Sequence, residues 1–63
     1  MRLIRLPDVM ARTSLKRSQL YEMMGRGAFP KPVKLSHGGR NNCWPESEID
    51  AWIESRIAER EAA

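Results

Sequence analysis

The segment Phe29-Pro30-Lys31-Pro32 constrains the fold of this 63-residue chain more than any other feature. Pro30 and Pro32 both lack a backbone N–H donor, and each pushes the residue before it toward extended geometry, so no helix can run through the segment. Two short helical patterns precede these prolines. A strand pattern and a longer helical pattern follow them.

Residues 7–27 have the outline of a helix-turn-helix. The first helix is expected over residues 7–12, because a proline suits the first turn and the acid after it lies near the positive helix end. Thr13-Ser14 interrupts that helix. A second helix starts near Lys16, and Gly27 is its best terminator. Its apolar residues recur at helical spacing: Leu20, Met23 and Met24.

The residues after the prolines predict a wing hairpin over 33–44. Residues 33–36 alternate with the period of a strand, Gly38-Gly39 suits a tight turn, and residues 41–44 provide the return strand. The apolar start of the chain, residues 1–6, is either an edge strand or a docked arm. We therefore predict a mainly α fold with a small β-hairpin, that is, three helices plus a two-stranded wing.

The third helix is expected over residues 45–60. Pro45 and Ser47 are both plausible starts, and Ser47 with Asp50 resembles a capping box. An apolar stripe docks this helix on the body: Ile49, Trp52, Ile53 and Ile57. Cys43 is expected to be a small core residue. The rest of the expected core is Met10, Leu15, Leu20, Met24, Phe29, Leu35, Trp44, Ile49, Trp52 and Ile53.

The size and composition exclude several classes of protein. A chain of this length makes one small domain, 1–63, of marginal stability. Its single cysteine excludes an internal disulfide, and one His with one Cys is too few for a zinc site, which takes about four protein ligands. No catalytic set is present, so we expect neither an enzyme nor a cofactor. No apolar run approaches the ~20 residues of a membrane span, so a cytoplasmic protein is expected.

Charge is divided unevenly along the chain. Residues 1–44 carry nine Lys and Arg against two acids, and residues 45–63 carry two against six. The balance of +7 and −4 gives the net +3 of the whole chain. A basic body of this density suits a polyanion, most simply nucleic acid, although a solvated basic surface would have the same composition.

The second helix carries the residues best suited to read DNA. The N-terminal turn of such a helix meets base edges in the major groove, and here it reads Lys16-Arg17-Ser18-Gln19. Arg and Gln bond bidentately to guanine and adenine, and Ser suits a base or a phosphate. Glu22 faces the same side, where it either accepts from a cytosine amino group or pairs with Arg26; we favour the pairing.

The hairpin tip is a second candidate contact with DNA. Arg40 follows the Gly-Gly turn and suits a minor groove or a phosphate. Lys31 and Lys34 are most simply phosphate ligands. The expected DNA-contacting residues are Ser14, Lys16, Arg17, Ser18, Gln19, Tyr21, Glu22, Arg26, Lys31, Lys34, His37, Arg40 and Asn41.

A series of short motifs, specific in order and spacing, resembles the AlpA family of prophage regulators over roughly residues 3–57. The motifs are Leu6-Pro7-Asp8-Val9, Thr13-Ser14-Leu15-Lys16-Arg17-Ser18, Tyr21, Arg26-Gly27, Phe29-Pro30-Lys31-Pro32-Val33, Gly39-Arg40, Trp44 and Ser47-Glu48-Ile49-Asp50-Ala51-Trp52. The resemblance implies a MerR-like winged helix-turn-helix, related to phage excisionases. It places residues 16–21 on the recognition helix and 37–42 in the wing. Two positions depart from the family: Lys16 replaces a Ser or Thr cap, and Glu22 replaces a basic residue.

The resemblance implies a DNA-binding regulator of a prophage or genomic island, acting at the nucleoid. Such a protein is either a transcriptional activator or a recombination directionality factor that promotes excision. Its partners would be double-stranded DNA, an integrase or RNA polymerase, and further copies of itself bound cooperatively. The competing interpretation is a protein-interaction module, such as an antirepressor, that works through the acidic last helix.

Overall fold

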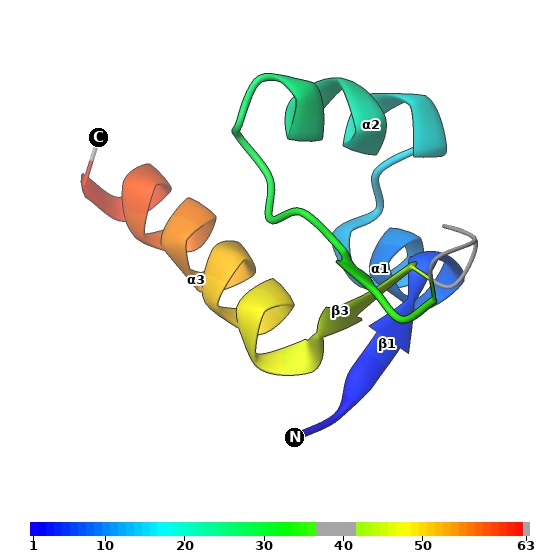
Figure 1. The fold of residues 1–63 in the computed structure, drawn as a ribbon. Helices are drawn as coiled ribbons and strands as arrows, with labels where there is room; N and C mark the ends of the chain where they lie inside the picture. Colours follow the sequence, from blue (N-terminus) through cyan, green and yellow to red (C-terminus); the bar gives the residue numbers. More distant parts are fainter. Residues whose placement is uncertain (37–41, 63) are drawn as a thin grey trace.

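A computed structural model describes residues 1–36 and 42–62 of the chain (Figure 1). Its elements in chain order are β1 (Leu3–Arg5), α1 (Leu6–Thr13), α2 (Arg17–Gly25), β2 (Val33–Lys34), β3 (Asn42–Pro45) and α3 (Glu46–Ala62). Three helices and a small antiparallel sheet confirm the predicted fold class, a mainly α winged helix-turn-helix. None of the described helices is long and apolar enough to cross a membrane.

The sheet has three strands, two from the wing and one from the start of the chain, where either an edge strand or a docked arm was expected. β3 lies in the middle and pairs antiparallel with β1 on one side and β2 on the other. Residues 3–5 are thus an edge strand, with Ile4 opposite Trp44. β2 ends at Lys34, earlier than predicted. Leu35 lies beyond the last strand pair and is 53% exposed, so its assignment to the core was wrong.

The two helices of the helix-turn-helix are separated by three residues, 14–16, one position later than the break predicted to begin at Thr13. α1 begins one residue before Pro7 and continues to Thr13, whose Oγ1 donates to the Val9 carbonyl at 2.8 Å. Ser14 adopts the left-handed conformation with φ 60° and ends α1. Ser14 is thus the C-cap residue of α1, and the N-cap position of α2 belongs to Lys16.

α2 begins at Arg17, with Lys16 as its N-cap residue. The lysine side chain has no acceptor and makes no capping hydrogen bond. Instead Gln19 Oε1 accepts from the Lys16 backbone N–H at 3.0 Å, which is one half of a capping box. Because Lys16 stands where the family has a Ser or Thr cap, the start of α2 has one side-chain hydrogen bond, the one accepted by Gln19.

Gly27 ends α2 as predicted. Its φ is +74°, a left-handed conformation that costs glycine little. The Ala28 N–H donates to the Met23 carbonyl at 2.8 Å and the Gly27 N–H to the Met24 carbonyl at 3.1 Å. This pair of bonds is a Schellman motif, which satisfies carbonyls left free at the helix end.

α3 begins directly at the end of the sheet. Pro45 is the last residue of β3, and the Glu46 N–H donates to the Arg2 carbonyl at 2.8 Å. Ser47 lies inside the helix, so the predicted capping box at Ser47 was wrong. The backbone of the residue before β1, and not a side chain, satisfies the first N–H of the helix. The helix extends away from the other elements (Figure 1). Ile57, in its C-terminal half, is 42% exposed.

One hydrophobic core joins all three helices to the sheet. Five expected residues are buried: Leu20, Met24, Phe29, Trp44 and Ile49. Cys43 is also buried, as expected. Four expected residues are partly buried against the core: Met10, Leu15, Trp52 and Ile53. Ile4 and Val9 were missed, although both are almost fully buried. The burial of Ile4 follows from β1 pairing with β3, which local patterns do not reveal, and Val9 is buried where α1 packs on the core.

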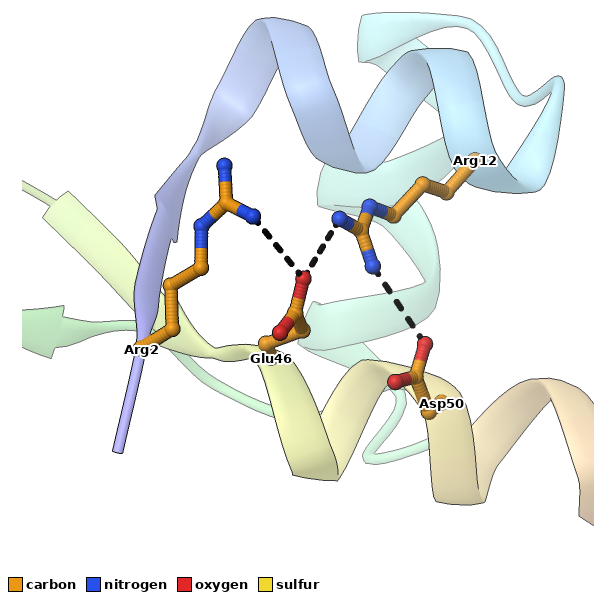
Figure 2. A network of polar contacts seen from close by, with 4 residues as sticks. All are labelled: Arg2, Arg12, Glu46 and Asp50. Carbon is orange, nitrogen blue, oxygen red and sulfur yellow. Dashed lines mark hydrogen bonds and ion pairs between the residues drawn. The ribbon is translucent and has the colours of Figure 1, made fainter.

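Ion pairs connect the N-terminal segment, α1 and α3. Glu46 Oε2 lies 2.6 Å from Arg12 and 3.7 Å from Arg2, and Arg12 also lies 3.4 Å from Asp50 (Figure 2). The hydrogen bond from Arg12 to Glu46 raises the pKa of the Arg12 guanidinium. We define Arg2, Arg12, Glu46 and Asp50 as the Glu46 network.

Candidate nucleic-acid interface

α2 has one buried side and one exposed side, as its sequence predicts. Leu20 and Met24 are buried in the core, with Met23 partly buried beside them. The candidate contact residues on α2 and at its N-cap are all exposed: Lys16, Arg17, Ser18, Gln19, Tyr21 and Glu22. The side of the helix that carries the basic and amide groups is thus free to meet a ligand.

Arg17 and Tyr21 contact each other on this exposed side. The Arg17 guanidinium carbon lies 5.6 Å from the centroid of the Tyr21 ring. This geometry is a cation–π contact, which restrains a long side chain without neutralising its charge. Arg17 therefore presents its donors from a preferred position at the first turn of α2.

Glu22 and Arg26 form the ion pair that we favoured from the sequence. Their closest atoms are 4.0 Å apart, one helical turn from each other, and both side chains are well exposed. An exposed pair of this length contributes little to stability. It does reduce the local charge of both residues.

The two lysines after α2 share a groove with it. This groove, of about 490 Å³, lies between α2 and the strands of the wing. Its polar and aromatic lining comes from Tyr21, Lys31, Lys34 and Asn42, and we name it the lysine groove. The structure thus brings Lys31 and Lys34 to the side of α2 that carries Tyr21.

A second groove lies on the other side of Tyr21. It has a volume of about 300 Å³ and is lined by Arg5, Leu6, Pro7, Arg17, Tyr21, Asn42 and Trp44. We name it the arginine groove. Because both grooves contain Tyr21 and Asn42, they are adjacent, and we name the two together the trough. Sequence analysis missed Arg5 as a candidate site residue, because only strand pairing brings it to α2.

Ion pairing separates the basic residues into two groups. Within residues 1–36 and 42–62, five arginines have a carboxylate partner: Arg2, Arg12, Arg26, Arg56 and Arg60. The five basic residues without one in the same ranges are Arg5, Lys16, Arg17, Lys31 and Lys34. Four of these line the two grooves, and Lys16 precedes Arg17. The uncompensated positive charge is therefore concentrated around α2.

The remaining expected contacts have different outcomes. Ser14 is exposed at the turn between α1 and α2, where its backbone ends α1. Arg26 is held by Glu22 just after α2. His37, Arg40 and Asn41 lie outside the described residues.

Comparisons with known proteins agree with this architecture. The family model described as Prophage CP4-57 regulatory protein (AlpA) matches residues 2–57. An uncharacterized protein, ORF88 of Enterobacteria phage P4, is 46% identical over 59 residues. That alignment covers 94% of this chain and 65% of the phage protein, so the chain spans less than two thirds of that relative's length. The match to nearly the whole chain shows that it belongs to the AlpA family of prophage regulatory proteins.

Proposed function

We propose that this protein binds double-stranded DNA as a regulator of a prophage or genomic island. The observation that carries the proposal is the position of the uncompensated cations, which surround an exposed helix of a helix-turn-helix. Lys and Arg that lack intramolecular acids are available to neutralise phosphates, and doing so releases the counterions of DNA.

The two parts of this surface would contact different parts of the duplex. The first turn of α2, with Arg17 and Ser18, is the part that reaches base edges when such a helix enters the major groove. Lys31 and Lys34, in the lysine groove, suit phosphates on the flanking strand. Gln19 has its Oε1 engaged at the helix start, so its amide N–H groups are its free donors.

The proposed biological role depends on where in the prophage the protein binds the DNA. An activator would recruit RNA polymerase to a promoter, and an excision factor would position an integrase at attachment sites. Both roles place the protein at the nucleoid in the cytoplasm, and cooperative self-association on repeated sites would serve either. The family description, a prophage regulatory protein, suits both.

The competing interpretation, a protein-interaction module using the acidic last helix, is less favoured by the structure. Of the six acids in residues 45–63, four have arginine partners in the same chain: Glu46, Asp50, Glu59 and Glu61. Acids that already pair within the chain offer little net charge to a partner.

A footprint tests the proposal directly. The purified protein is titrated onto the promoter of the neighbouring integrase gene and onto the attachment sites of the element. Protection of discrete sites, with affinity that falls steeply as salt rises, supports DNA binding. Protection at the promoter alone favours activation, and protection at attachment sites favours excision. No binding to any duplex at low salt would refute the proposal and favour the protein-interaction module.

A further inference from the structure

The arginine groove contains a positively charged residue, Arg5, that lies outside the helix-turn-helix. Arg5 comes from β1, and Arg17 comes from the first turn of α2, yet both line the same hollow. Neither guanidinium has a carboxylate partner within the described ranges. Two unpaired arginines lining one groove give it a positive potential, which attracts an anion.

The position of Arg5 is fixed by the strand that carries it. Ile4 is 2% exposed in the core and lies opposite Trp44, while Arg5 is exposed and lies opposite Cys43. Because side chains alternate along a strand, the burial of Ile4 directs Arg5 to the other face. Arg2, on the same N-terminal segment, is instead held by Glu46 (Figure 2). Of the two arginines of this segment, only Arg2 has a carboxylate partner in the described ranges.

The backbone beside Arg5 also favours an anion. Arg5 is the N-cap residue of α1, and no side chain caps this helix end. The partial positive charge of a helix N-terminus therefore faces the same region as the Arg5 guanidinium. Asp8, the acid in the first turn of α1, does not line the groove.

Asn42, which lines the groove, carries a buried polar atom. Its Oδ1 has no hydrogen-bond partner among the described residues. Buried side-chain oxygens normally accept at least one hydrogen bond. A water molecule held between this oxygen and a bound anion would donate to both, as bridging waters do in protein–DNA interfaces.

We infer that the arginine groove binds a backbone phosphate of the DNA duplex, with Arg5 as a contact residue. This inference rests on the proposed function and extends its surface to the N-terminal strand. The trough would then follow one DNA strand, with phosphates on Lys31 and Lys34 on one side of Tyr21 and a phosphate on Arg5 on the other, while Arg17 remains the residue placed to reach a base edge. A phosphate contact carries no sequence information, so Arg5 contributes equally on every duplex.

The test compares Arg5→Gln with a charge-matched control. Arg60→Gln removes the same charge from α3, where Arg60 lies 4.0 Å from Glu61. Binding of each variant to a fluorescent random-sequence duplex of 20 base pairs is measured by anisotropy between 50 and 300 mM KCl. Arg5→Gln should weaken binding roughly tenfold at low salt and reduce the salt slope by about one. Arg60→Gln should leave the slope unchanged, and Arg5→Lys should restore most of it.

The outcomes separate this inference from the proposed function. If the wild type binds and Arg5→Gln has the affinity and slope of Arg60→Gln, the arginine groove holds no phosphate and the proposed function stands. If the wild type binds no duplex, both the inference and the proposed function are wrong. Where Arg5→Gln unfolds, an NMR titration of the wild type with the same duplex decides. Shifts at Arg5 and Asn42 but not Arg60 support the site, and unmoved Arg5 and Asn42 signals refute it.

Discussion

Phe29 and Trp52 meet edge to face, with ring centroids 4.7 Å apart and an interplanar angle of 66°. The Trp52 indole also donates to the Ala28 carbonyl at 2.9 Å, and the Trp44 indole donates to the Pro30 carbonyl at 2.9 Å. The segment between α2 and β2 has no regular structure, so the two tryptophans supply the hydrogen bonds that a helix or strand would provide. They fix the position of α2 relative to the sheet and α3.

Truncating Trp52 should therefore destabilise the whole domain. Trp52→Ala removes the ring contact with Phe29 and leaves the Ala28 carbonyl without its donor, at a cost of about 3 kcal/mol. Trp52→Phe keeps a ring and loses only the hydrogen bond, so about 1 kcal/mol is expected. Thermal melts followed by circular dichroism measure both. A Trp52→Ala variant that melts with the wild type would show that α3 does not depend on this contact.

Gly27 should tolerate alanine less well than Gly25 does. Neither position has an atom within 4 Å of an added Cβ, so packing does not distinguish them. Gly27 has φ +74°, where an L-residue costs about 1–2 kcal/mol, whereas Gly25 is the last residue of α2. Gly27→Ala should lower the unfolding free energy by about 1 kcal/mol, and Gly25→Ala should leave it unchanged or slightly raised. Equal urea midpoints for the two variants would contradict the left-handed helix end.

Arg12 should stabilise the fold more than Arg56 does. Arg12 connects α1 to Glu46 and Asp50 of α3, whereas Arg56 pairs with Glu59 on its own helix. Arg12→Gln should lower the melting midpoint more than Arg56→Gln, and 1 M NaCl should reduce the difference because salt screens ion pairs (about 3 Å Debye length). A larger effect from Arg56→Gln would mean that the Glu46 network does not hold the elements together.

Sequence patterns predicted the elements whose signals are local. The spacing of Leu20 and Met24 defined the buried side of α2, and Gly27 defined its end, because both depend on residues within a few positions. The pairing of Glu22 with Arg26 was predicted for the same reason. The exposed side of α2, and most of the candidate site, thus follows from neighbours in the chain.

The parts that were missed depend on residues far apart in the chain. Arg5 pairs with Cys43 across the sheet, and nothing near Arg5 in sequence reveals that it will lie beside α2. The same pairing buries Ile4. Leu35 shows the reverse error, because its alternation predicted a strand, whereas its burial required an element to cover it. The alternation of apolar and polar residues does not by itself show which face of a strand another element covers.

Arg17 should distinguish a specific DNA site from other sequences. Its guanidinium is held near Tyr21 at the first turn of α2, where base edges are within reach of a recognition helix. Arg17→Ala should cost about 1–3 kcal/mol on a footprinted site and less on random DNA. Competition titrations with both duplexes measure the difference. Equal losses on both would indicate a phosphate contact, and no loss on either would remove Arg17 from the interface.

Glu22 should weaken DNA binding in the wild-type protein. Its carboxylate lies on the exposed side of α2, and its only partner in the described part of the chain is Arg26 at 4.0 Å. Glu22→Gln removes repulsion from phosphates and releases Arg26, so affinity for a random duplex should rise roughly two- to fivefold at low salt. Glu54→Gln, on α3, removes the same charge away from α2 and should change affinity less. If Glu22→Gln instead weakens binding only on the footprinted site, the carboxylate accepts from a cytosine amino group and Glu22 is a specificity residue.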